Sequence, residues 1–251
     1  MNIDRLGHAT VLVGSGKVGI LMDPTLMNEF ESGATTLHPP LDIDVDRLNR
    51  VTTAVLLSHS HMDHFCIRSL AKLRRDITIL YPRGDKLINT CLRLLGFTNR
   101  LPVDGGRVIK SGELSIFPTP SRAHFPEIGA LFVDPNGAFW NMVDTVVEEA
   151  EIAQVRTLAT RIDLLFAKYQ PLIEEDLVVD SLGSHFPVER YGRLLRSVLA
   201  IDPAVVVAGS CGYRFLSEPW LDNRAFPVSE RRFIRDVSRL SSRIKAISVP
   251  H

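Results

Sequence analysis

Short apolar runs alternate with amphipathic segments along this chain, which is the pattern of an α/β protein. Runs of aliphatic residues predict buried strands, and apolar residues spaced three or four apart predict helices that pack on one face. The predicted strands cover 10–13, 18–22, 53–57, 77–81, 108–109, 114–117, 130–133, 138–142, 164–167 and 204–208. The predicted helices cover 67–75, 85–95, 148–158, 188–199 and 229–245. The segment from 53 to 95 predicts a βαβ unit with a right-handed crossover.

Turn residues divide these elements. Gly14-Ser15-Gly16 predicts a β-hairpin, and Asp134-Pro135-Asn136-Gly137 predicts a turn between two strands. The segment from Leu26 to Pro40 predicts a long loop rich in turn residues, which is typical either of a flap over a site or of a surface loop. No linker, short repeat or low-complexity tract interrupts the pattern, so we expect one domain over residues 1–251.

The segment from 58 to 64 has the highest density of potential metal-binding side chains in the sequence. Three imidazoles and one carboxylate fall within six positions directly after strand 53–57, and they are His59, His61, Asp63 and His64. Such a loop at the carboxyl end of a strand is where α/β sheets usually place ligands. Imidazole and carboxylate are preferred zinc ligands, and imidazole also suits iron, nickel and copper. A packed core histidine would stand alone, so the cluster predicts a metal site.

Three further candidate ligands stand where predicted strands end. Two metals about 4 Å apart need roughly three protein ligands each and a shared one. The arrangement that fits places His59, His61 and His124 on one metal, Asp63, His64 and His185 on the other, and Asp144 between them. Asp144 alone would also serve as a helix N-cap. His8 and His38 have no comparable context, and we expect neither to be a ligand, with His8 the nearer to the site.

Composition narrows the class of protein. The chain has 251 residues with 29 basic and 29 acidic side chains, so no overall charge favours nucleic acid or a membrane surface. No apolar run is long enough to cross a membrane, and the N-terminus lacks the pattern of a signal peptide. Three scattered cysteines do not form a disulfide framework. We expect a cytoplasmic protein that acts on a small-molecule substrate and binds neither nucleic acid nor a membrane. Whether it is a monomer or a homo-oligomer is left open.

The cluster His-x-His-x-Asp-His, with Gly7-His8-Ala9-Thr10 and Asp23-Pro24, resembles the metallo-β-lactamase superfamily over nearly the whole chain. The resemblance implies a four-layer αβ/βα sandwich with the metal centre at one edge. It implies two divalent metal ions, zinc first, with iron or manganese as alternatives. Position by position it assigns His59, His61 and His124 to site one, Asp63 and His64 to site two, and Asp144 as the bridge.

The two halves of the chain resemble different branches of that superfamily. The N-terminal half is similar to the branch of L-ascorbate-6-phosphate lactonase and N-acyl-phosphatidylethanolamine phospholipase D. Residues 140–145 and 208–213 resemble the lactamase-fold part of CMP-N-acetylneuraminate hydroxylase, an iron-dependent oxygenase, but its Rieske Cys/His pairs are absent here. In the hydrolases a last histidine follows the final core strand, where this chain has Gly209-Ser210-Cys211-Gly212. Either His185 substitutes, or Cys211 binds, or site two is weak or empty.

These observations predict an enzyme and leave its reaction open. The leading interpretation is a metal-dependent hydrolase, in which a metal-activated hydroxide attacks an ester, lactone, amide or phosphodiester of a small molecule. Asp63 or Asp144 would then act as catalytic residues that orient the hydroxide and move its proton. The alternatives are a non-haem iron or diiron oxygenase, which needs an external electron donor, and a non-catalytic metal-binding member. Arg122, Tyr213 and Arg214 are the predicted substrate contacts, because arginine recognises carboxylate and phosphate.

Overall fold

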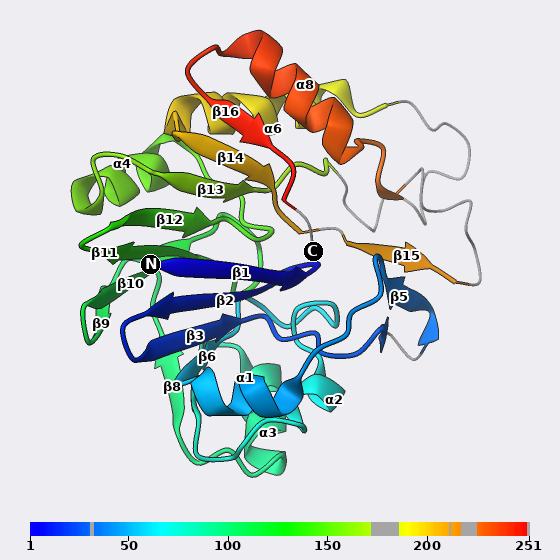
Figure 1. Ribbon diagram of the computed structural model, residues 1–251, viewed down its shortest axis with the longest axis vertical. Helices are drawn as coiled ribbons and strands as arrows, with labels where there is room; N and C mark the ends of the chain where they lie inside the picture. The colour runs from blue at the N-terminus through cyan, green and yellow to red at the C-terminus, as the bar shows by residue number, and fades with distance from the viewer. Residues whose placement is uncertain (31–32, 172–185, 211, 217–224, 250–251) are drawn as a thin grey trace.

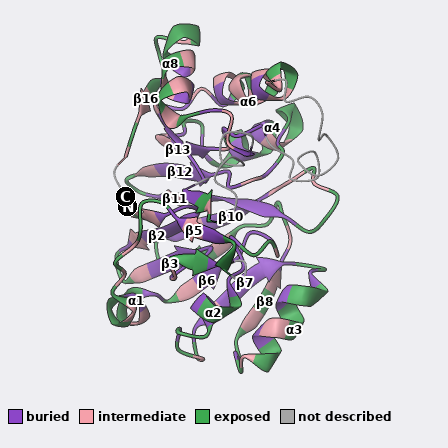
Figure 2. Cartoon of the chain, turned by 90° about the vertical axis from the view of Figure 1, so that its right-hand side faces the viewer, coloured by how far each residue is buried: buried purple, intermediate pink, exposed green. Residues whose placement is uncertain are grey.

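Two β-sheets pack face to face, and helices cover the outer face of each sheet (Figure 1). This computed structural model describes residues 1–30, 33–171, 186–210, 212–216 and 225–249. The order of helices, sheet, sheet and helices is the predicted αβ/βα sandwich, which is therefore confirmed. Figure 2 shows that buried residues concentrate in the strands and exposed residues on the outer sides of the helices.

The N-terminal sheet has six strands in the order β1-β2-β3-β6-β7-β8. They are β1 (Asn2–Gly7), β2 (Thr10–Ser15), β3 (Val18–Met22), β6 (Ala54–Leu56), β7 (Thr78–Pro82) and β8 (Arg100–Val103). The predicted hairpin is β2 and β3, and from β3 to β8 the neighbouring strands are parallel. Helices α1 (Val45–Val51), α2 (Ile67–Leu70) and α3 (Lys86–Leu94) lie outside it. The predicted helix 67–75 is wrong beyond α2, and β8 and α1 were not predicted.

The C-terminal sheet has seven strands in the order β16-β14-β13-β12-β11-β10-β9. They are β9 (Ile109–Ser111), β10 (Leu114–Pro120), β11 (Ile128–Asp134), β12 (Gly137–Asn141), β13 (Leu164–Ala167), β14 (Val205–Ala208) and β16 (Lys245–Ile247). Its helices are α4 (Glu149–Leu158), α6 (Val188–Ile201) and α8 (Glu230–Leu240). Asp134 pairs with Gly137 across the predicted turn. The predicted helix 229–245 is too long, because extended backbone at Ser241 ends α8 before β16 pairs with β14.

A third, small sheet joins the two halves of the chain at one edge of the sandwich. It contains β4 (Glu29–Phe30), β5 (Thr35–Leu37) and β15 (Tyr213–Phe215), in the order β15-β5-β4. Part of the segment from Leu26 to Pro40 is therefore ordered as strands and is not a plain loop. Pairing of β5 with β15 places Gly212 beside His38, whose backbone N–H donates to the Gly212 carbonyl at 2.8 Å.

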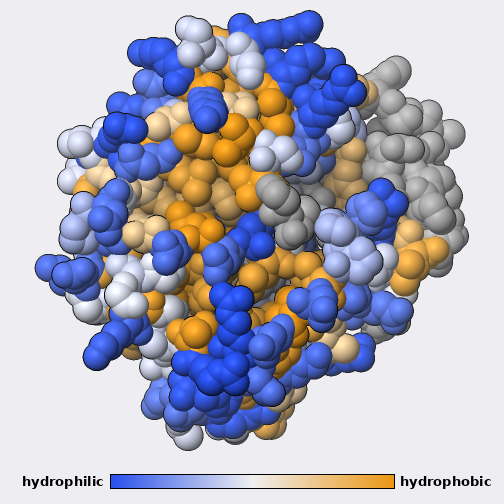
Figure 3. Space-filling model, viewed as in Figure 1, coloured by the Kyte–Doolittle hydropathy of each residue, from blue (hydrophilic) through white to orange (hydrophobic). Residues whose placement is uncertain are grey.

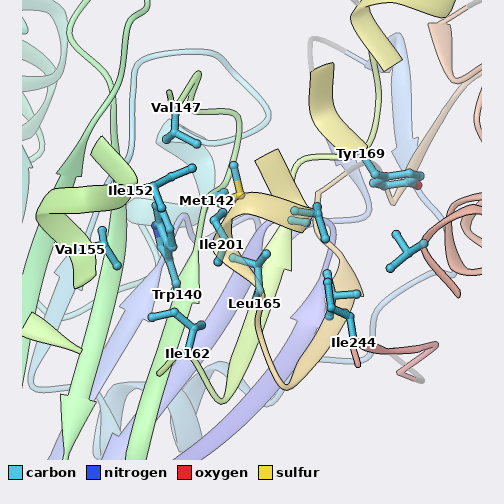
Figure 4. Close-up of a cluster of buried hydrophobic side chains, with 14 of the residues drawn as sticks. Trp140, Met142, Val147, Ile152, Val155, Ile162, Leu165, Tyr169, Ile201 and Ile244 are labelled. Atoms are coloured by element: carbon cyan, nitrogen blue, oxygen red, sulfur yellow. The ribbon is translucent and has the colours of Figure 1, made fainter. Parts of the chain in front are cut away.

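Three apolar clusters hold the layers together. One lies between the sheets, and the other two join each sheet to its own helices. The cluster under α4 and α6 surrounds the fully buried Trp140, whose Nε1–H donates to the Thr119 hydroxyl (Figure 4). On the face seen in Figure 1, apolar side chains gather towards the middle, with hydrophilic ones around them (Figure 3). None of the described helices is long and apolar enough to cross a membrane.

One glycine allows the N-terminal sheet to pack against the end of α1. A Cβ on Gly19 in β3 would lie 2.1 Å from the Val51 carbonyl oxygen, whereas a Cβ on Gly14 in β2 would meet nothing nearer than 3.9 Å. We expect Gly19→Ala to lower the free energy of unfolding by about 1–3 kcal/mol, the usual cost of overpacking. Urea denaturation measures this change in the free energy of unfolding. Gly14→Ala is the matched control in the same hairpin, and an equal loss in both variants would contradict this account.

Candidate metal centre

The candidate metal ligands meet at the edge where the strands of both sheets end. Asp23 follows β3, and the segment 58–64 follows β6 in the N-terminal sheet. Asp144 follows β12, and Ser210 follows β14 in the C-terminal sheet. The Ser58 carbonyl accepts the backbone N–H of Ile128 at the start of β11, so the two sheets are joined at this edge.

Asp23 is the buried anion on which the histidine loop is built. Its side chain accepts the Ser58 backbone N–H at 2.7 Å on Oδ1 and the Ser58 hydroxyl at 2.6 Å on Oδ2. Oδ2 also lies 3.0 Å from Nδ1 of His64. Its φ of 43° is left-handed, which aspartate tolerates better than most residues. Because an ionised carboxylate only accepts, Nδ1 of His64 carries a proton, and Nε2 is the nitrogen that a metal ion would bind.

The same reasoning fixes the tautomer of His59. The Ser58 hydroxyl gives its proton to Asp23, so its oxygen accepts the proton on Nδ1 of His59, 2.9 Å away. Nε2 of His59 therefore carries no proton and presents a lone pair. In the described part of the chain, Nε2 of His59 and Nε2 of His64 are both buried and have no hydrogen-bond partner. Buried polar atoms without partners are rare, and two of them side by side are the donor atoms that a cation would bind.

Two carboxylates face the lone pair of His64. The Asp63 and Asp144 Oδ2 atoms lie 3.1 Å and 3.3 Å from Nε2 of His64. The ligand atoms of His59, His64 and Asp144 lie within 4.8 Å of one another, as do those of His8, Asp63 and His64. A lone pair facing two carboxylates is repulsive unless a proton or a metal ion lies between them. The donor set therefore fits a divalent metal ion, and His59, His64, Asp63 and Asp144 are the residues that would hold it.

The electrostatics of these side chains agree with this donor set. Burial, reinforced by His64, lowers the pKa of His59 to about 2. Burial opposes the charge on His64, but Asp63 and Asp144 outweigh it and raise the pKa of His64 well above its usual value. In the same way His64 outweighs burial and lowers the pKa of Asp63 and that of Asp144. Both aspartates are therefore anionic at neutral pH, with a positive charge between them.

His8 holds Asp63 in place. The Gly212 backbone N–H donates to Nδ1 of His8 at 3.2 Å, so Nε2 of neutral His8 carries the proton. That proton points at Oδ2 of Asp63, 3.0 Å away. Although the distances alone group His8 with Asp63 and His64, this tautomer makes His8 a donor to the carboxylate and not a metal ligand.

Asp144 is positioned by a strained turn and two donors. Val143 has a left-handed φ of 53°, which is uncommon for a β-branched residue and typical of functional turns. Ser210 donates its hydroxyl to Oδ1 of Asp144 at 2.8 Å, which leaves Oδ2 towards His64. The Lys168 ammonium donates to the Asp144 backbone carbonyl at 2.5 Å. Ser210 lies where the resemblance predicted a last histidine, and it instead orients the Asp144 carboxylate.

The segment from 121 to 128 lies over the histidines. His61 is exposed, with its ring centroid 4.5 Å from that of His59 and 5.0 Å from that of Phe125. His124 is also exposed, and neither His61 nor His124 belongs to the two ligand groups among the described residues. Both stay predictions as ligands. His185 and Cys211 lie outside the described residues, so the proposed substitute ligands for site two stay predictions as well.

Glu127 is a residue of the site that the sequence did not reveal. Its carboxylate is buried, with Oε1 3.9 Å from Nδ1 of His59, and the Ser121 hydroxyl donates to it. Burial raises its pKa. A single glutamate in a loop has no recognisable sequence pattern. Glu127 comes close to His59 because the next residue, Ile128, donates its backbone N–H to the Ser58 carbonyl at the start of β11.

The three predicted substrate contacts occupy different surroundings. Tyr213 is buried, with its ring 5.1 Å from that of His8, so it packs behind the metal edge. Arg214 is exposed on β15. Arg122 pairs with Glu151 at 2.9 Å and with Glu148 at 3.7 Å. Their contact with a substrate stays a prediction.

Solved structures share this fold at low sequence identity. The diiron β-hydroxylase CmlA from Streptomyces venezuelae matches with a TM-score of 0.64 and 18% identity, over 98% of this chain and 52% of CmlA. The isothiocyanate hydrolase from Delia radicum gut bacteria matches with a TM-score of 0.70 and 16% identity, over 100% of this chain and 96% of the hydrolase. Hydrolases and a hydroxylase therefore share this architecture.

Sequence comparison places the chain in a family. A UPF0173 protein of Pyrococcus abyssi is 28% identical over 116 residues, which is 46% of each chain, so the match spans about half the length of that relative. The profile described as the Beta-lactamase superfamily domain matches residues 2–162, which include Asp23, the histidine cluster and Asp144. Together with the sandwich fold, this match shows that the chain belongs to the β-lactamase superfamily, with the metallo-β-lactamase fold.

Proposed function

We propose that this protein is a metal-dependent hydrolase that acts on an ester, lactone, amide or phosphodiester of a small molecule. The observation that carries the proposal is the pair of buried, unpartnered Nε2 atoms of His59 and His64 beside two anionic carboxylates. The isothiocyanate hydrolase supports it, since it shares the fold over nearly its whole length.

These residues would hold two divalent ions between them. His59 and His61 would hold one ion, and His64 and Asp63 would hold the other. Asp144, whose Oδ2 lies 3.3 Å from Nε2 of His64, would be available to both. His124 would join the first ion and His185 the second.

Each side chain then has a distinct task. When bound, the metal supplies Lewis acidity and lowers the pKa of a coordinated water to about 7. Asp63 accepts a hydrogen bond from His8 on Oδ2, so its Oδ1 is the oxygen available to take the proton of the attacking water. The water oxygen joins the acyl or phosphoryl centre, and the proton leaves through Asp63 with the alcohol or amine. Lys168 and Ser210 keep Asp144 fixed during this exchange.

The second candidate function is a non-haem iron oxygenase. It is favoured by the number of carboxylates at the centre, since Glu127 joins Asp63 and Asp144 near His59 and His64. Histidine and carboxylate ligands with open positions suit iron and oxygen. The diiron hydroxylase CmlA shares the fold, although this chain covers only 52% of it. Electrons would come from an external donor.

Metal content separates the two functions. We expect protein purified without added metal to carry zinc, manganese or iron when measured by elemental analysis. Zinc or manganese, with turnover of simple lactones or phosphodiesters, supports the hydrolase. Near-stoichiometric iron with oxygen uptake on reduction supports the oxygenase instead. Protein that takes up none of these metals, even after incubation with them, would refute both functions.

A further inference from the structure

A cavity of about 690 Å³ opens between α4 and α6, next to the turn that carries Asp144. We infer that this cavity binds an amphipathic anion, with an apolar segment and a carboxylate, sulfonate or phosphate group. We further infer that this occupant is the part of the substrate remote from the metals, which rests on the proposed hydrolase function. Its volume lies within the range of ordinary small-molecule sites, about 300–1,000 Å³.

The floor of the cavity is apolar. Met142, Val147 and Ile152 line it and belong to the buried cluster between the C-terminal sheet and its helices. Figure 4 shows these three side chains close together beside Trp140. Leu194 of α6 contributes a further apolar wall. Met142, Val147 and Ile152 expose little surface themselves, so an apolar group would gain about 25 cal/mol for each Å² of the remaining apolar lining that it covers.

The walls are cationic. Five lysine or arginine side chains line the cavity, against two glutamates. Within the described part of the chain, neither Arg193 nor Arg196 has a carboxylate partner, whereas Arg122 is held by Glu148 and Glu151. On an ordinary exposed helix face, arginine side chains point into water and line no cavity. Here Arg193 and Arg196 lie on the same helix wall as Leu194, above the apolar floor, which is the arrangement that an amphipathic anion requires.

Lys168 connects the cavity to the metal centre. It lines the cavity, and its ammonium donates to the Asp144 carbonyl, while Oδ2 of the same aspartate lies 3.3 Å from Nε2 of His64. An ammonium has three donors, so Lys168 keeps two for an anion. The cavity and the metal centre thus share the Asp144 turn as a wall, and a ligand held in one lies beside the other.

Two matched probes test the cavity by fluorescence titration. The first is 8-anilinonaphthalene-1-sulfonate, and the second is N-phenyl-1-naphthylamine, which has the same rings without the charge. We expect Arg193→Gln/Arg196→Gln to lower the preference for the sulfonate over the amine at least tenfold, with thermal unfolding as the check on the fold. Arg239→Gln, an exposed arginine at the end of α8, is the control and should leave the preference unchanged. An unchanged preference in the double variant, or an equal loss in the control, would overturn the site.

A pair of esters tests whether the occupant is substrate. Mono-4-nitrophenyl glutarate and 4-nitrophenyl pentanoate differ only in a terminal carboxylate in place of a methyl group. In the metal-loaded protein we expect the double variant to lower the ratio of their kcat/KM values at least tenfold. If the sulfonate preference falls and this ratio does not, the cavity binds an anion that is not the substrate. If the wild-type protein hydrolyses neither ester nor simple lactones, the proposed function fails, and probe binding still decides the cavity.

Discussion

We expect His64→Ala to lose the metal ion that His64 and Asp63 would hold. The lone pair of His64 lies 3.1 Å from Oδ2 of Asp63 and 3.3 Å from Oδ2 of Asp144, so this nitrogen stands at the junction of the two candidate ligand groups. Without the imidazole, two carboxylates face each other in a buried site with no positive charge between them. Asp23 also loses one of the two donors on its Oδ2. Elemental analysis after dialysis should find that at least half of the wild-type metal is lost, and hydrolysis should fall at least about 100-fold, because the Lewis acid beside Asp63 is lost.

Two further variants isolate the cause. His64→Asn keeps an amide that can donate to Asp23 but has no imidazole nitrogen for the metal, so it should recover thermal stability without recovering metal. His38→Ala removes an exposed histidine of the same edge, which is joined to Gly212 through its backbone, and should keep full metal content. Wild-type metal content in His64→Ala would remove the structural basis for the proposed centre.

Local sequence patterns predicted most of the central strands and helices, because periodicity records which face of an element is buried, whereas the four-layer order was predicted from the family resemblance. The run Val55-Leu56-Leu57 is apolar throughout, and it lies in the middle of the N-terminal sheet. Apart from α1 and the predicted helix 67–75, the failures are mainly short strands at the edges of sheets. β16 has only three paired residues, one of them an exposed lysine, so its sequence merges with the preceding helix. Edge strands bury one side at most and leave a weak pattern.

The candidate site was predictable only in part, and for a related reason. The histidine cluster lies within seven consecutive residues, so its chemistry is visible without the fold. The groups that orient it are distant in sequence. His8 and Gly212 are 204 residues apart, and Ser210 and Asp144 are 66 apart. These contacts depend on strand order, which brings separate chain segments to one edge, and no local spacing records that order.

Asp23→Asn tests whether these orienting contacts control the metal. Asp23 accepts three hydrogens, one on Oδ1 and two on Oδ2, but an asparagine side chain has a single acceptor oxygen. If the amide nitrogen takes the place of Oδ2, it donates to Nδ1 of His64 and moves the imidazole proton to Nε2, where it blocks the metal. If it takes the place of Oδ1, the buried N–H of Ser58 loses its acceptor, at a cost of about 1–3 kcal/mol.

We therefore expect Asp23→Asn to weaken metal binding about 10- to 100-fold, the usual effect of losing an outer partner of a metal ligand. Competition with a chelator measures the affinity, and nitrogen NMR of the labelled imidazoles reports the tautomer of His64. Asp85→Asn is the matched control, since Asp85 is a buried carboxylate that caps α3 by accepting the Ile88 N–H. Asparagine caps helices as well as aspartate does, so the control should keep both stability and metal. Wild-type affinity in Asp23→Asn, with the proton of His64 still on Nδ1, would show that Asp23 supports the loop without setting the tautomer on which metal binding depends.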